Sequence, residues 1–92
     1  MDYRMLAECS DTAIKKIFQQ INDEGSSEVL ESIKQQMIFI RDNALEGKNP
    51  ALALEAGRQF TYGILASREF ASPKELELKE YIDKVSRVLD DD

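Results

Sequence analysis

The chain has 92 residues, of which 42% are apolar and 33% are charged, and it carries a formal net charge of −6. This composition is typical of one globular domain, which we place at residues 1–92, and it excludes a disordered chain. The acidic balance argues against nucleic-acid binding, because counterion release from phosphates requires clustered lysines and arginines. With a single cysteine, no export signal and no apolar run of membrane-spanning length, we expect a cytoplasmic protein that does not insert into a membrane.

The first helix is predicted over about residues 2–23. Its apolar residues recur at steps of three and four, which is the helical period. They are Leu6, Cys9, Ala13, Ile17 and Ile21. A start at Ser10-Asp11, with the preceding residues frayed, is the alternative. Gly25 follows two acidic residues and ends the helix.

The second helix is predicted over residues 27–46, with Ser26 or Ser27 as its N-cap. Its buried seam is expected to consist of Leu30, Ile33, Met37, Ile40 and Ala44. At about 100° per residue, Phe39 lies nearly opposite that seam. Two interpretations stay open: either the helix is covered on two sides, or Phe39 is exposed and available for docking.

The third helix is predicted over residues 50–67, after a tight hinge. Gly47 can take the left-handed conformation that ends a helix, and Asn49 and Pro50 suit the start of the next one. Apolar residues fall on more than one side of this helix, so it is either the most buried element or one that offers a face to a partner. The interior glycines Gly57 and Gly63 indicate close packing, since each costs up to ~1 kcal/mol relative to alanine in a helix.

The fourth helix is predicted over residues 73–89. Ser72, Pro73 and Glu75 stand in the order of a capping box with proline at the first helical position. Its seam is expected to consist of Leu78, Ile82, Val85 and Leu89. The acidic run at residues 90–92 should fray the last turn. Four helices, short loops and no segment of strand periodicity predict an all-α fold, an antiparallel up-down-up-down four-helix bundle.

Catalytic chemistry has little support in the sequence. Histidine is absent, which removes the commonest general base and metal ligand. The sequence has no glycine-rich phosphate loop, paired-cysteine zinc pattern or nucleophile–base arrangement. We therefore predict that the protein is not an enzyme and binds no cofactor or metal.

A helical domain of this kind acts by presenting a surface to a protein partner. The candidates for partner binding are the apolar residues that the four seams leave over. They are Phe39, Leu54, Tyr62 and Leu65. Ordinary packing in helices covered on two sides is the alternative. If the four residues form a contact face, Tyr62→Ala and Leu65→Asp should weaken the interaction and leave the helix content largely intact.

Short segments spread in order over about residues 11–89 resemble a known family. They are Ala13-Ile14-Lys15-Lys16-Ile17, Gly47-Lys48-Asn49-Pro50, Arg58, Tyr62 and Leu65, and Phe70-Ala71-Ser72-Pro73 followed by Leu76 and Leu78. Together they resemble the immunity proteins of pediocin-like (class IIa) bacteriocins, the enterocin A immunity family. The resemblance implies a cytosolic four-helix bundle that protects the producer cell. Its implied partner, bound from the cytosolic side, is a mannose-type phosphotransferase permease that holds the bacteriocin.

Two other hypotheses use the same surface argument. In the first, the protein is a non-catalytic helical module that caps a toxin enzyme directly or acts as a regulatory adaptor. In the second, the leftover apolar residues form a homodimer seam, although we expect a monomer. A soluble nuclease or hydrolase recovered as the partner would favour direct capping, and sedimentation would decide the question of the dimer.

Overall fold

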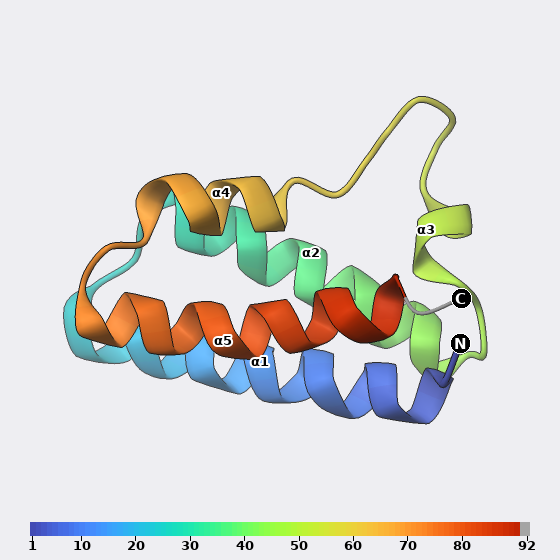
Figure 1. Ribbon diagram of the computed structural model, residues 1–92, viewed down its shortest axis with the longest axis horizontal. Helices are drawn as coiled ribbons and strands as arrows, with labels where there is room; N and C mark the ends of the chain where they lie inside the picture. The colour runs from blue at the N-terminus through green and yellow to red at the C-terminus, as the bar shows by residue number, and fades with distance from the viewer. Residues whose placement is uncertain (91–92) are drawn as a thin grey trace.

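Helices are the only regular secondary structure within residues 1–90, the part of the chain that the computed structural model describes (Figure 1). The helices are α1 (Tyr3–Glu24), α2 (Glu28–Leu45), α3 (Pro50–Ala53), α4 (Tyr62–Glu69) and α5 (Pro73–Leu89). The predicted all-α class is therefore confirmed for the described residues. The prediction of one continuous helix over residues 50–67 is wrong, because residues 54–61 separate the short α3 from α4. The described residues thus form five helices, whereas four were predicted.

Four of these helices surround a common interior. α1 lies against α2 and α5, α4 lies against the same two helices, and α3 contacts α2. In Figure 1, α1 and α5 run side by side along the molecule, while the shorter α4 covers only the half nearest the turn between α1 and α2. Because α4 is short, the other half of the molecule on this side is occupied by the chain segment that precedes α4.

Side-chain caps set the start of the three long helices. Ser27 caps α2, and Ser72 forms a capping box with Glu75 at the start of α5, as the sequence predicts. Asp2 caps α1, with its carboxylate accepting a hydrogen bond from the helix backbone at 3.0 Å. The cap at Asp2 decides against the alternative helix start at Ser10-Asp11.

The core is built mainly from the predicted seams. All five predicted seam residues of α2 are buried. The largest fully buried apolar side chains are Leu6, Ile17, Ile33, Met37, Ile40, Pro50, Ile82 and Val85. Cys9, Ile21 and Leu89 are partly buried at the edge of this core. Because α2 contacts α1, α3 and α4, the interpretation of this helix as covered on more than one side is correct.

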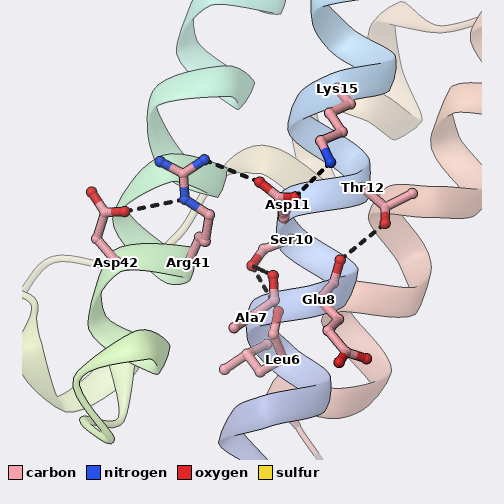
Figure 2. Close-up of polar contacts among 9 residues, drawn as sticks. All are labelled: Leu6, Ala7, Glu8, Ser10, Asp11, Thr12, Lys15, Arg41 and Asp42. Carbon is pink, nitrogen blue, oxygen red and sulfur yellow. Dashed lines mark hydrogen bonds and ion pairs between the residues drawn. The ribbon is translucent and has the colours of Figure 1, made fainter.

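A polar network joins α1 to α2 (Figure 2). The buried Ser10 hydroxyl donates back into its own helix, to the carbonyl oxygen of Leu6 at 2.7 Å. On the neighbouring surface, Asp11 lies 3.1 Å from the Lys15 ammonium and 3.2 Å from the Arg41 guanidinium of α2. The hydrogen bond from Lys15, assisted by Arg41, lowers the pKa of Asp11. The folded state therefore favours the ionised carboxylate.

The lowered pKa of Asp11 predicts a contribution to stability that depends on pH. Because the folded-state pKa lies below the ordinary value of 3.8, the contribution is complete above about pH 5 and is lost as the pH falls through the folded-state value. Asp11→Asn should lower the free energy of unfolding by about 0.5 kcal/mol at neutral pH, since the carboxylate is partly exposed and screened. Urea denaturation at neutral and strongly acidic pH measures the difference, with Asp23→Asn as the control. An equal deficit at both pH values would contradict the assignment.

No helix within residues 1–90 is both long and apolar enough to cross a membrane. The acidic run at residues 90–92 begins at Asp90, which is the C-cap of α5. Residues 91 and 92 lie outside the described part of the chain. The last turn of α5 is helical up to Leu89, and the prediction that the acidic run frays this turn stays a prediction.

Candidate functional site

The segment between α3 and α4, residues 54–61, departs most from regular helix packing, and we call it the strap. In Figure 1 the chain leaves the body of helices after α3 and returns at the start of α4. Near the tip of the strap, the Arg58 amide donates to the carbonyl oxygen of Glu55 at 3.0 Å, and Gly57 has a φ of +83°. A side chain at this φ would be strained, so Gly57 serves the turn. The prediction that Gly57 permits close helix packing is therefore wrong.

Gln36 of α2 holds the point where the strap returns to the fold. Its side-chain oxygen accepts hydrogen bonds from the amides of Thr61 and Tyr62 at 2.8 and 2.9 Å. Its side-chain nitrogen donates to the Thr61 hydroxyl at 2.9 Å. These amides stand at the start of α4, where the helix itself offers no acceptor, and Thr61 makes no side-chain capping bond. Gln36 thus supplies, from another helix, the N-cap that α4 lacks.

Three aromatic rings connect the strap to the helices. Phe60, near the end of the strap, lies between Phe39 of α2 and Tyr62 of α4, with ring centroids 6.0 and 5.9 Å apart. Both pairs have inclined rings, an arrangement that the aromatic quadrupole favours over a flat sandwich. The Tyr62 hydroxyl lies 2.9 Å from the Ser86 hydroxyl of α5. Burial, followed by the effect of the Asp90 carboxylate, raises the pKa of Tyr62, so this ring stays neutral.

An open cleft of about 480 Å³, which we call the strap cleft, lies between the strap, α4 and the end of α5. Its lining includes Leu54, Phe60, Tyr62, Gly63, Ser86 and Leu89. Two opposite charges, Arg58 of the strap and Asp90 at the end of α5, also line it. Within residues 1–90, neither charge forms an ion pair. The cleft therefore combines apolar surface with two charges available to a partner.

A smaller hollow of about 270 Å³ lies between α1 and α5. Most of its lining is polar or charged, and Lys74 beside it is engaged with Glu24 at 3.6 Å. The Lys16 ammonium lies 5.2 Å from the centre of the Tyr81 ring and covers the main aromatic surface there. This hollow resembles a solvated helix interface, so we take the strap cleft as the candidate site.

The structure places the four predicted contact residues around the strap, but not on one exposed face. Leu54 and Tyr62 meet in the lining of the strap cleft, whereas Phe39 and Leu65 do not line it. Phe39 packs against Phe60, and Leu65 lies partly buried against the core. Tyr62 is itself a core residue with 5% of its surface exposed. The role of these four residues in partner binding stays a prediction.

Sequence reasoning missed Gln36, Gly63 and Asp90 as residues of the site. Among the described residues, no atom lies within 4 Å of a Cβ atom placed at Gly63, so the prediction that this glycine permits close packing is wrong. The only sequence signal for Gly63 was its place inside a predicted helix. That signal indicated close packing against another helix and not a cleft. Gln36 carries no local signal, because the amides that it caps lie 25 and 26 residues further along the chain.

The strap cleft presents groups that are suited to binding. Among the described residues, no three side chains of the metal-binding types gather closely enough to hold a metal ion. The strap cleft offers apolar surface, two hydroxyls already bonded to each other, and two charges. Such a set of groups fits recognition of another molecule by shape and charge.

A comparison with known protein families matches nearly the whole chain, from residue 5 to residue 91, to the family described as Tsi6. The chain belongs to the Tsi6 family. Tsi6 proteins are immunity proteins of type VI secretion. No curated protein and no solved structure matches the chain.

Membership of the Tsi6 family corrects the resemblance to bacteriocin immunity proteins. Both are immunity families, so the general prediction of a protective role is supported, whereas the pediocin-like assignment is wrong. The segments that carried the resemblance include the hinge at residues 47–50 and the cap at residues 70–73, which specify helix ends in many helical domains. A Tsi6 protein has a toxin protein as its implied partner, and a mannose-type permease has no support.

Proposed function

We propose that this member of the Tsi6 family protects the cell that makes it by binding a toxin protein directly and covering the surface through which the toxin acts. The match of residues 5–91 to an immunity family carries this proposal. Direct capping of a toxin, which the sequence left as an alternative, takes precedence over permease binding. In this proposal the protein acts in the cytoplasm, by occupancy and without catalysis. The shape and charges of the candidate site support binding of this kind.

The charge of the chain supports a partner whose contacting surface is basic. The chain carries a net charge of −6, and three of its negative charges fall in the acidic run at residues 90–92. Opposite charges on the toxin would steer the encounter and raise the association rate, while the affinity itself would come from buried apolar contacts. Association should accordingly slow as the salt concentration rises.

Protection of living cells tests this proposal. The toxic domain encoded by the reading frame beside that of this chain is expressed from one inducible promoter, and the chain from another, in a strain that lacks both genes. We expect coexpression to restore growth and the two purified proteins to elute together in size-exclusion chromatography. An unrelated acidic helical protein of similar size is the control. Growth arrest despite abundant folded chain, or rescue without a complex, would refute direct capping.

A further inference from the structure

We propose that the strap cleft receives a protruding segment of the toxin, with an apolar side chain inserted into the cleft between a basic and an acidic residue of the same segment. The basic residue faces Asp90 and the acidic residue faces Arg58. This inference rests on the proposed function and adds the chemistry by which the toxin is recognised.

The size and openness of the strap cleft favour a protein segment over a small molecule. Its volume of about 480 Å³ lies within the range of about 300–1000 Å³ that is typical of ligand pockets. Such pockets usually enclose most of a small ligand, whereas this cleft is partly open to solvent. A segment that protrudes from a larger protein would close the opening with its own body.

The lining of the strap cleft favours an apolar side chain at the centre of that segment. Leu54, Phe60 and Leu89 supply apolar atoms from the strap and from α5. The hydroxyls of Tyr62 and Ser86 are bonded to each other at 2.9 Å, so each already has one hydrogen-bond partner within the protein. Burial of apolar surface is therefore the main gain in the interior of the cleft.

The charges of the cleft determine which residues should flank that apolar side chain. Arg58 lines the cleft from the strap and Asp90 lines it from the C-cap of α5, and they are the only charged residues within 1–90 that line it. Within residues 1–90, neither forms an ion pair. A segment with a base for Asp90 and an acid for Arg58 complements both charges and fixes its direction in the cleft.

Anchoring of the strap only near its ends allows it to adapt to this occupant. Phe60 and the amides held by Gln36 fix one end, and α3 rests on α2 at the other. Between them, residues 55–59 are all exposed. The strap can therefore shift over a bound segment without disturbing the core.

A substitution of Gly63 that places a large side chain in the strap cleft tests the inference. A Cβ atom at this position meets no atom of residues 1–90 within 4 Å, and Gly63 lies in α4 without a positive φ. Gly63→Ala should therefore fold at least as well as the wild type, since alanine is the better helix former, and should bind the toxin domain of the protection experiment within about threefold of the wild type. Gly63→Phe should fold but weaken binding at least about thirtyfold, because its ring occupies the place of the anchor side chain. Gln35→Phe adds the same ring at an exposed position of α2 and is the matched control.

Charge reversal tests the flanking contacts. Arg58→Glu and Asp90→Lys should each weaken binding about tenfold, whereas Glu55→Lys, an exposed strap residue that does not line the cleft, should have little effect. Isothermal titration calorimetry with the purified toxin domain measures all variants, and circular dichroism confirms their folding.

The outcomes separate this inference from the proposed function. A wild-type chain that fails to bind the toxin domain overturns both. A wild-type chain that binds, together with a folded Gly63→Phe variant that binds equally well, overturns the cleft assignment alone. Sedimentation equilibrium of the chain by itself supplies one more outcome. A wild-type dimer that Gly63→Phe dissociates would assign the cleft to a second copy and overturn the inference.

Discussion

Replacing Tyr62 with alanine should lower the free energy of unfolding by about 3–4 kcal/mol. The ring is 5% exposed and packs in the core, in contact with Phe60 of the strap. Its removal would leave a cavity that the surrounding helices can fill only in part. The loss is a large share of the roughly 5–15 kcal/mol that stabilises a typical domain. Urea denaturation followed by circular dichroism measures it.

Two smaller changes separate the ring of Tyr62 from its hydroxyl. Tyr62→Phe and Ser86→Ala each remove one partner of the 2.9 Å bond between the two hydroxyls and should cost about 1 kcal/mol. If Tyr62→Ala proved no more destabilising than these two variants, the ring would not be part of the core.

The burial of Tyr62 changes how the substitutions suggested by the sequence must be interpreted. Sequence analysis predicts that Tyr62→Ala and Leu65→Asp weaken partner binding while the helices persist. Tyr62 is buried and Leu65 packs against the core. A loss of protection in either variant could therefore reflect a less stable fold instead of a lost contact with the partner. Gly63→Phe is the cleaner test of contact, because a Cβ atom at Gly63 meets no described atom within 4 Å and the residue is not part of the buried core.

Replacing Gln36 with alanine should lower the free energy of unfolding by about 1–2 kcal/mol, a loss comparable to removal of a strong N-cap. The side-chain oxygen of Gln36 is the acceptor for the amides of Thr61 and Tyr62. Without it, the first turn of α4 should fray and the strap should detach at this end. Faster hydrogen exchange at these two amides and faster tryptic cleavage after Arg58 would measure that opening.

The matched variants for Gln36 are Gln36→Glu and Gln35→Ala. A carboxylate at position 36 can still accept from both amides, and its negative charge is favourable at a helix N-terminus, so most of the stability should remain. Gln35 is exposed on the same helix, and its replacement should have little effect. Protection of the Thr61 amide that is unchanged in Gln36→Ala would show that this side chain does not hold the strap.

The correction of the family assignment has a physical basis. The segments that resembled bacteriocin immunity proteins include the hinge at residues 47–50 and the cap at residues 70–73. Glycine, asparagine, serine and proline occur at these places because helix ends need particular backbone angles and hydrogen-bond acceptors. Those needs are common to unrelated helical domains, so such segments indicate where helices begin and do not identify a partner.

Local sequence by itself determined the three long helices of this protein. The caps at Ser27 and Ser72 and the apolar seam of α2 were predicted and are present. Each of these features depends on residues a few positions apart, so the interactions that specify it are already complete within one or two helical turns. The all-α class follows from the same local information.

The strap cleft, in contrast, was decided only by the tertiary structure. Residues 50–67 carry apolar side chains on several sides, and their spacing is compatible with a continuous helix. Glycines at 57 and 63 weaken that helix, while the hydrogen bonds of Gln36 and the contact of Phe39 with Phe60 favour the broken form. These contacts join residues more than twenty positions apart, and helical periodicity carries no information about such partners. The same long-range packing buried Tyr62 and left a cleft beside Gly63.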